Sequence, residues 1–264
     1  MKYYDLNLKG TNYHQDKELI LEAHYVGWDY LNLLYSPLDY QNAISYKNEL
    51  IEDINNALLN KKLNNNNNID LNKKPIKEIE IEFGLEINPK NQNELIKLSR
   101  KFRDKTKFIS VLGGDLVINR SACENIMVDM LSRPYYKQRT CGINHVLAKE
   151  AYKNNVAIEL CFNDILSSYL SYRSKIMAHF REIIKLHKKF KFPLVITTGA
   201  SSFWDIRSPR DISAIFKYLG LSEKDLTACF HDYPKVLVDF NNERENMVVL
   251  GVKKINKGDK NNET

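Results

Sequence analysis

The sequence predicts a single α/β domain built as a TIM-like (β/α) barrel. Short segments rich in β-branched residues alternate with helical segments along most of the 264 residues, a pattern typical of parallel strands joined by helices. The number of strands and the chain length favour a closed or nearly closed barrel, with an open doubly wound sheet as the second choice. With 43% hydrophobic residues, the chain is able to bury one sizeable core.

The predicted strands are short and mostly apolar, and turn residues or helical patterns bound them. Their carboxyl ends, with the loops that follow, are where a barrel of this type carries its function. In chain order, the strands are Lys2–Leu8, Trp28–Leu34, Ile76–Ile87, Phe108–Leu112, Met127–Leu131, Val156–Leu160 and Pro193–Thr197.

Helical patterns separate most of these strands. Gly27 is suited to ending the first helix, while Ser208 as N-cap and Pro209 at the first helical position are suited to starting the last. The main predicted helices are Asp16–Tyr25, Tyr40–Leu59, Glu94–Phe102, His145–Lys153, Asp164–Lys189 and Asp211–Leu219.

Two polar segments stand apart from this pattern. Segment 60–75 includes five consecutive asparagines and four lysines, and it has nothing to bury that would offset its ordering entropy. We expect a disordered surface insertion there, within a barrel spanning 1–252, and a flexible lysine-rich tail over 253–264. These segments carry most of the formal charge of +6, so net charge alone is poor evidence for a nucleic-acid partner.

The composition excludes several classes of protein. No apolar run approaches the roughly 18 residues that a membrane span needs, and the first residues lack the basic and then apolar pattern of a signal peptide. We therefore expect a cytoplasmic protein. Cys123, Cys141, Cys161 and Cys229 have neither zinc-ligand nor disulfide-framework spacing, so they are expected to be reduced core residues.

Polar and basic residues follow the predicted strands, at the rim of the barrel. Gly113 and Gly114 with Asp115 are interpreted as a tight turn with a capping aspartate, in preference to a general base or metal ligand. Arg207 and Arg210 flank one helix start, where guanidinium groups and backbone amides suit an anion. The rim is therefore predicted to favour phosphate oxygens.

Two basic features on helices have both a structural and a functional interpretation. Arg120 is placed to pair with Glu124 or to hold a phosphate, and both interpretations remain open. His145, Lys149 and Lys153 recur at every fourth position and so lie along one helix face. Such a stripe is more often a solvated face than an RNA contact.

The histidines do not form a recognisable metal site. A hydrolytic metal barrel needs imidazoles and carboxylates that converge on the strand ends, and no His-x-His or His-Glu-x-x-His occurs. His14 is expected on a turn and His231 in a late loop, while the other four fall on predicted helices. A nucleophile elbow, a P-loop and a dinucleotide-binding glycine motif are also missing from the sequence. We therefore predict no catalytic residue and no metal ligand in this chain.

Several motifs recur in a characteristic order and spacing along the chain. They are Asp5-Leu6-Asn7, Gly113-Gly114-Asp115, Asn119-Arg120, Val128-Asp129-Met130-Leu131, Gly142 to Ala148, and Arg207 to Asp211. Taken together, these motifs resemble the ribonuclease P protein family called component 3 in archaea and the thirty-kilodalton subunit in eukaryotes. The resemblance runs from about Tyr3 to the region of Pro234.

The resemblance implies a TIM-like barrel related to the polymerase and histidinol phosphatase superfamily. Metal-dependent members of that superfamily begin with a His-x-His motif near the first strand, and Asn7 and Lys9 stand at the corresponding positions here. An amide replaces an imidazole poorly as a ligand, and a lysine ammonium repels a metal ion. The resemblance therefore implies that metal chemistry is lost from this barrel.

The resemblance also implies a function. Ribonuclease P removes the 5′ leader of precursor tRNA, its RNA subunit supplies the active site and holds magnesium, and this type of subunit pairs with a small partner protein. Contact with precursor tRNA is expected to be indirect. The residues expected to contact phosphate or stabilise the partner-bound complex are Arg120, Arg133, Lys149, Arg207 and Arg210. The alternatives are a metal-dependent phosphoesterase on the same barrel and a scaffold that binds protein alone.

Overall fold

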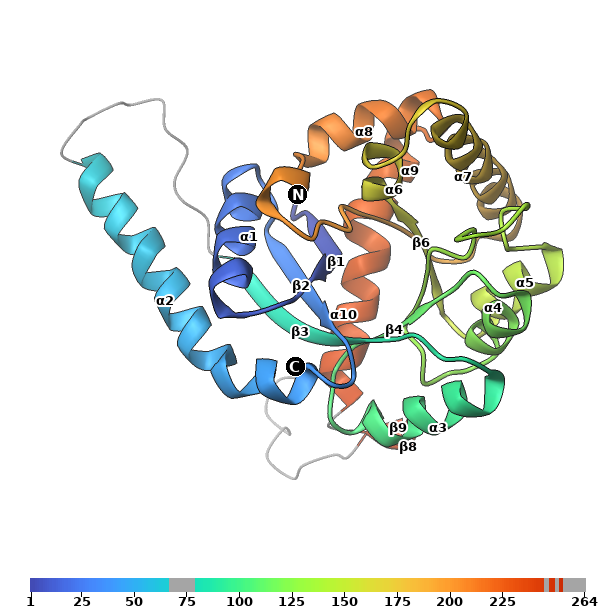
Figure 1. The fold of residues 1–264 in the computed structure, drawn as a ribbon, viewed down its shortest axis with the longest axis horizontal. Coiled ribbons are helices and arrows are strands. Elements are labelled where there is room, and N and C mark those ends of the chain that lie inside the picture. Colours follow the sequence, from blue (N-terminus) through green and yellow to red (C-terminus); the bar gives the residue numbers. More distant parts are fainter. Residues whose placement is uncertain (67–78, 245–246, 250–251, 254–264) are drawn as a thin grey trace, which may run out of the picture.

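The computed structural model describes residues 1–66, 79–244, 247–249 and 252–253, with side chains described for 1–60 and 79–244. Seven parallel strands follow one another around a sheet in chain order. Figure 1 shows helices arranged around these strands. They are β1 (Tyr4–Lys9), β2 (Tyr30–Tyr35), β3 (Glu80–Ile87), β4 (Ile109–Leu112), β5 (Met130–Ser132), β6 (Ala157–Cys161) and β7 (Leu194–Thr197). All seven predicted strands are confirmed, with ends shifted by a few residues.

The first and last strands approach each other, so that the barrel is nearly closed. The Lys9 amide donates to the Ala200 carbonyl over 2.8 Å, and the Thr198 hydroxyl donates to Asp5 over 2.5 Å. These bonds join the upper end of β1 to the loop after β7. The prediction of a nearly closed α/β barrel is therefore confirmed, and the open sheet is excluded.

Helices surround the strands, and the predicted ones are present, with two corrections. The segment 60–66 is helical, because α2 continues through it, and residues 67–75 of the predicted insertion lie outside the described residues. The helices as far as α7 are α1 (Tyr13–Tyr25), α2 (Tyr40–Asn66), α3 (Gln92–Arg103), α4 (Leu116–Cys123), α5 (His145–Lys153), α6 (Phe162–Leu166) and α7 (Leu170–Phe190).

The second correction concerns the predicted helix 164–189, which the structure divides into α6 and α7. The Ser168 hydroxyl donates to the Asp164 carbonyl, Tyr169 is extended, and Leu170 has a φ of 47°. A non-glycine residue in the left-handed region interrupts a right-handed helix. The break leaves the Leu170 side chain 90% exposed at the start of α7.

Between β7 and Arg244 the chain is mostly helical. His231 lies in a π-helical turn rather than in a loop, and His14 lies in α1 rather than on a turn. The remaining elements are η1 (Phe203–Asp205), α8 (Pro209–Tyr218), α9 (Glu223–Thr227), η2 (Ala228–Asp232), α10 (Tyr233–Glu243), and the antiparallel pair β8 (Met247–Val249) and β9 (Val252–Lys253). The rest of the predicted tail, 254–264, lies outside the described residues.

Two layers of side chains fill the barrel interior. At the amino ends of the strands the layer is apolar, and Leu237 and Val238 of α10 complete it, so that this helix closes the floor (Figure 1). At the carboxyl ends the layer is polar and fully buried. The floor is formed by Tyr4, Leu6, Tyr30, Phe108, Met130, Ala157 and Val195, and the upper layer by Asn7, Asn32, Ser110, Ser132, Glu159 and Thr197.

Candidate nucleic-acid interface

The polar upper layer lies at the mouth of the barrel and is organised by Glu159 of β6. Its carboxyl group accepts hydrogen bonds from Asn7 Nδ2, Ser132 Oγ and Thr197 Oγ1, each over 2.5 Å. Glu159 is completely buried, and burying a carboxyl group is costly unless donors satisfy it. The three donors belong to three different strands, so Glu159 connects β1, β5 and β7 across the lumen.

Asp5 is a second buried carboxyl group, at the closure between β1 and β7. It accepts from the Asn7 amide over 3.2 Å and from the Thr198 hydroxyl over 2.5 Å. Burial raises the pKa of Asp5 from its ordinary 3.8 to about 7, although the bonds from Thr198 and Asn7 oppose this shift. Its partners are neutral donors, and neither hydrogen bond brings a positive charge to it.

The residues at the mouth do not fit a metal ion. Asn7 donates to Glu159, and the Lys9 ammonium forms an ion pair with Glu86 over 2.7 Å. Among the side chains that the structure describes, no three His, Cys, Asp or Glu residues are grouped as metal ligands. The two buried carboxyl groups already accept hydrogen bonds from amide and hydroxyl donors, and the Lys9 ammonium at the end of β1 would repel a cation.

Arg133 follows β5 at the rim, but its guanidinium is held by an ion pair. Its Nε donates to Asp164 Oδ2 over 2.8 Å, and Nη2 reaches the other carboxylate oxygen. The Tyr135 hydroxyl donates to the same carboxylate over 2.7 Å. The side chain of Arg133 is 24% exposed, and its two bonds to Asp164 help to fix the loop after β5.

Hydrogen bonds around Asn119 join three of the sequence motifs: Gly113-Gly114-Asp115, Asn119-Arg120 and the motif that begins at Gly142. Asp115 caps α4 through its bonds to two backbone amides, as predicted. Asn119 Nδ2 donates to the carbonyls of Pro134 and Gly142, each over 2.9 Å, and its oxygen accepts from the Gly114 amide over 3.1 Å. One buried amide therefore joins the loop after β4 to both ends of the loop after β5.

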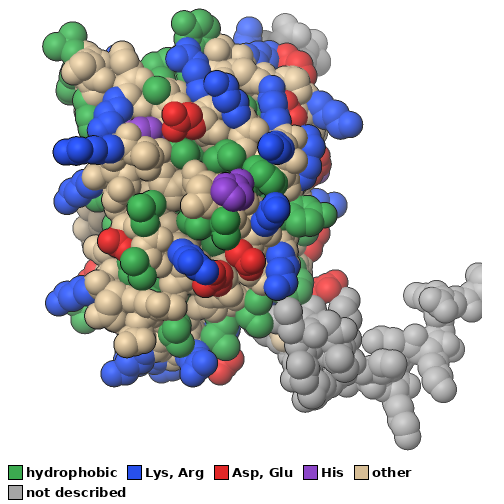
Figure 2. All heavy atoms as spheres, turned by 90° about the vertical axis from the view of Figure 1, so that its right-hand side faces the viewer, with side chains coloured by type: hydrophobic (Ala, Val, Ile, Leu, Met, Phe, Trp, Pro, Cys, Tyr) green, Lys and Arg blue, Asp and Glu red, His purple; other side chains and the backbone are tan. Residues whose placement is uncertain are grey.

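Arg120 and Lys149 lie on the outside of the barrel, on adjacent helices. Arg120 pairs with Glu124 over 2.8 Å and is 64% exposed, which confirms the ion pair and leaves the guanidinium accessible. Figure 2 shows the side of the molecule that carries α3, α4, α5 and α7, where basic side chains are spread widely and acidic ones are fewer. Exposed basic residues of these helices, called the basic face below, include Lys97, Arg100, Arg120, Lys149, Lys153 and Lys185.

Arg207 and Arg210 lie at the start of α8, a helix that does not contribute to the basic face. Ser208 caps the helix and Pro209 begins it, as predicted. Arg207 Nη1 donates to the carbonyls of Trp204 and Ile206, while Arg210 is exposed. Trp204 is 74% exposed, and the sequence analysis did not single it out. The five predicted residues therefore do not form one cluster: Arg133 is tied to Asp164, and the other four lie on two parts of the surface.

A comparison with models of protein families identifies the family of this chain. The model described as RNase P subunit p30 matches residues 2–246. The chain belongs to the RNase P subunit p30 family. Its relatives include ribonuclease P protein component 3 of Methanothermobacter thermautotrophicus, 35% identical over 96% of this chain and 95% of that protein. Another is component 3 of Methanococcus maripaludis strain C5, 34% identical over 66% of this chain and 76% of that protein.

Solved structures agree with the assignment to the p30 family. A chain in the cryo-electron microscopy structure of an archaeal ribonuclease P with mature tRNA is 26% identical, with a TM-score of 0.75, over 97% of this chain and 99% of that chain. Aspergillus niger ochratoxinase has a TM-score of 0.50 at 10% identity, over 88% of this chain and 70% of that chain. The second likeness shows the barrel fold alone. The described part of this p30-family chain has no helix that is long and apolar enough to cross a membrane.

Proposed function

We propose that this chain, as a protein subunit of ribonuclease P in the maturation of tRNA 5′ ends, binds RNA and a small partner protein and leaves the cleavage to a catalytic RNA. The family match over residues 2–246 carries the proposal. The barrel mouth supports it, because its buried carboxyl groups are satisfied by neutral donors. Such groups are poorly placed to activate water or to hold an ion.

The RNA contacts are assigned to exposed cations. Arg120, Lys149 and Arg210 are exposed, and guanidinium and ammonium groups in water exchange counterions for phosphate readily. Arg207 is anchored to backbone carbonyls, which leaves part of its guanidinium for an anion. Arg133 contributes by holding Asp164 and the loop after β5 in place. The magnesium ions of the reaction belong to the RNA in this account.

A reconstitution tests the proposal. Cleavage of precursor tRNA is measured at limiting magnesium with the catalytic RNA and the small partner protein, with and without this chain. The expected result is restored cleavage when both proteins are present and no cleavage by this chain alone. Cleavage without the RNA would support the phosphoesterase alternative, and no gain over the partner protein alone would contradict the proposal.

Salt dependence separates RNA contact from a role in binding protein alone. If several phosphates are contacted, the logarithm of the association constant falls linearly with the logarithm of salt concentration, with a slope of roughly 0.7 to 0.9 per contact. The charge reversals Arg120→Glu and Lys149→Glu should each make the slope shallower, whereas Lys224→Glu on α9 is the matched control outside the basic face. A flat salt response of the unaltered chain would favour the protein-binding scaffold.

A further inference from the structure

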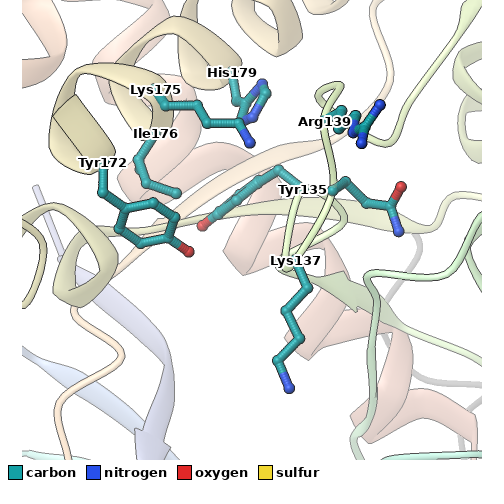
Figure 3. Close-up of a pocket in the computed structure, with 8 residues that line it drawn as sticks. Tyr135, Lys137, Arg139, Tyr172, Lys175, Ile176 and His179 are labelled. Atoms are coloured by element: carbon teal, nitrogen blue, oxygen red, sulfur yellow. The ribbon is translucent and has the colours of Figure 1, made fainter.

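A pocket of about 220 Å³ opens between the loop after β5 and helix α7. Figure 3 shows Tyr135 and Tyr172 with their hydroxyl groups directed toward one another, and Lys175 and His179 beside them on α7. Drug-sized ligands occupy pockets of roughly 300 Å³ or more, so this one suits a smaller planar group. It is called the Tyr172 pocket below, and its lining residues used in the argument are Tyr135, Arg139, Tyr172, Lys175 and His179.

The lining of the Tyr172 pocket combines cations with aromatic rings. Lys137, Arg139 and Lys175 contribute three positive charges, and none of the lining residues is acidic. All three cations are exposed. Tyr172 is 50% exposed, so one ring is accessible to a planar ligand. Single-stranded nucleic acid is recognised by this combination, in which bases stack on aromatic rings and phosphates meet cations.

His179 supplies an unused polar atom at the wall of the pocket. The residue is 5% exposed, and its Nε2 has no hydrogen-bond partner among the described residues. Its ring stacks on Tyr135, with 6.4 Å between ring centroids. Burial lowers the pKa of His179, although nearby Glu182 opposes the shift, and this direction favours the neutral ring. A neutral imidazole either donates to or accepts from a base edge, according to its tautomer.

The wall of the pocket is held before any ligand binds. Tyr135 is fixed by its bond to Asp164, and Asn119 holds both ends of the loop that carries Arg139. The Gln138 side-chain amide in this loop donates to the Gly114 carbonyl in the loop after β4. A site whose groups are already ordered loses less conformational entropy when a ligand binds.

We propose that the Tyr172 pocket binds one unpaired nucleotide of an RNA strand, with the base against Tyr172 and His179 and the adjoining phosphate on Arg139 and Lys175. The inference rests on the proposed function, because it assumes that RNA is the partner of this chain. It adds a site for a single unstacked base to the electrostatic contacts of the basic face. Neighbouring helix α5 packs against α7, so the strand would continue from the pocket toward Lys149.

Direct binding to the full chain tests the proposal with two probes of equal length, a fluorescent unstructured RNA of ten nucleotides and the same sequence as a duplex. Tyr172→Ala should weaken binding of the single strand about tenfold, the loss typical of one stacked base, and should leave duplex binding nearly unchanged. Tyr172→Phe, which keeps the ring, should retain most of the affinity. Tyr25→Ala is the matched control, since Tyr25 is 80% exposed at the end of α1.

The cations of the pocket give a second and independent readout. Lys175→Ala should reduce single-strand affinity and the salt slope more than Lys224→Ala, which changes an exposed lysine on α9, outside the basic face. With 4-thiouridine in the RNA, ultraviolet cross-linking should label the peptide containing Tyr172. Thermal unfolding of each variant tests whether a loss of folding causes the effect. Because Tyr172 and Lys175 are on the surface, the unfolding temperature should be nearly unchanged.

Three outcomes would overturn the inference. One is unchanged single-strand affinity in Tyr172→Ala, and another is an equal loss in Tyr25→Ala. The third is a Tyr172 variant that binds RNA normally but no longer binds the partner protein, which would make the pocket a protein site. If Lys149→Glu weakens RNA binding while Tyr172→Ala does not, only the pocket is rejected. If the unaltered chain adds nothing to the reconstituted cleavage, the proposed function is rejected as well.

Discussion

At the mouth of the barrel, Glu159 and Asp5 are completely buried and hydrogen-bonded to neutral groups, whereas on the basic face Arg120 and Lys149 are exposed. The mouth is where an enzyme of this fold carries its site. Here the polar groups at the mouth serve to connect strands, and the charges available to a ligand lie on the outer helices. The difference teaches that this barrel uses the polar groups at its mouth for its own structure and keeps many of its charged side chains exposed on the outer helices.

The largest expected effect comes from removing the acceptor at the mouth. Glu159→Ala leaves the buried donors of Asn7, Ser132 and Thr197 without their partner. Each unsatisfied group is costly, and the free energy of unfolding should fall by about 3–5 kcal/mol. Urea denaturation measures this, with Glu182→Ala on the exposed side of α7 as control. A loss below about 1 kcal/mol would show that Glu159 does not hold the mouth together.

The second effect is a dependence of stability on pH that originates in Asp5. Its pKa of about 7 in the folded protein lies above its ordinary 3.8, so the folded chain binds more protons than the unfolded chain between these two values. The contribution of Asp5 to stability is therefore largest below pH 4, is lost as the pH rises to 7, and is constant above that.

Asp5→Asn tests this dependence, because an amide does not titrate there. Denaturation at a series of pH values should give a stability profile that is flatter for the variant between pH 4 and 7. Asp104→Asn, at the exposed end of α3, is the control for the substitution itself. An identical slope in Asp5→Asn and in the unaltered chain would contradict the assignment.

A smaller loss of stability is expected from Asn119→Ala, and this variant should also change RNA binding at the outer surface. Asn119→Ala removes its bonds to Pro134, Gly142 and Gly114, and unfolding should require about 2 kcal/mol less. Because the same bonds hold the loop that carries Arg139, affinity for single-stranded RNA should fall although Asn119 is itself buried. Asn125→Ala is the comparison at the end of α4. Loss of stability with unchanged RNA affinity would separate the loop from the pocket.

The smallest effect on stability is expected on the outer surface. Arg120→Ala removes an exposed ion pair with Glu124, and such pairs contribute little to folding. Thermal unfolding should therefore be nearly unchanged, while the salt slope of RNA binding becomes shallower by roughly one contact. Glu124→Ala is the control that breaks the same ion pair and keeps the arginine. Equal loss of RNA binding in both variants would assign Arg120 a structural role.

The barrel could be predicted from the sequence because each strand and helix carries a local pattern. The break between α6 and α7 could not, since Ser168 and Tyr169 are compatible with a continuing helix and Leu170 must adopt a positive φ. α10 was missed as the floor of the barrel, because its apolar residues share a cluster with residues of β1, β2, β5, β6 and β7, which are distant from it in the sequence.

The candidate site was predictable only in part. Arg120 and Arg210 are exposed as a phosphate-binding role requires, but the partner of Arg133 is Asp164, thirty-one residues away, and no local pattern indicates that pair. The structural role of Glu159 could have been predicted, because a carboxyl group within an apolar strand must find hydrogen-bond donors. The Tyr172 pocket could not have been predicted from the sequence, since its walls come from the loop after β5 and from α7.

The most direct test compares the mouth with the basic face in one assay. Precursor tRNA cleavage by the reconstituted complex at limiting magnesium is measured for Asp5→Asn and for the double variant Arg120→Glu with Lys149→Glu, after both are shown to be folded. The account predicts near-normal cleavage for Asp5→Asn and a large loss for the double variant. Loss of cleavage in folded Asp5→Asn, with normal cleavage in the double variant, would place the function at the mouth and contradict the account.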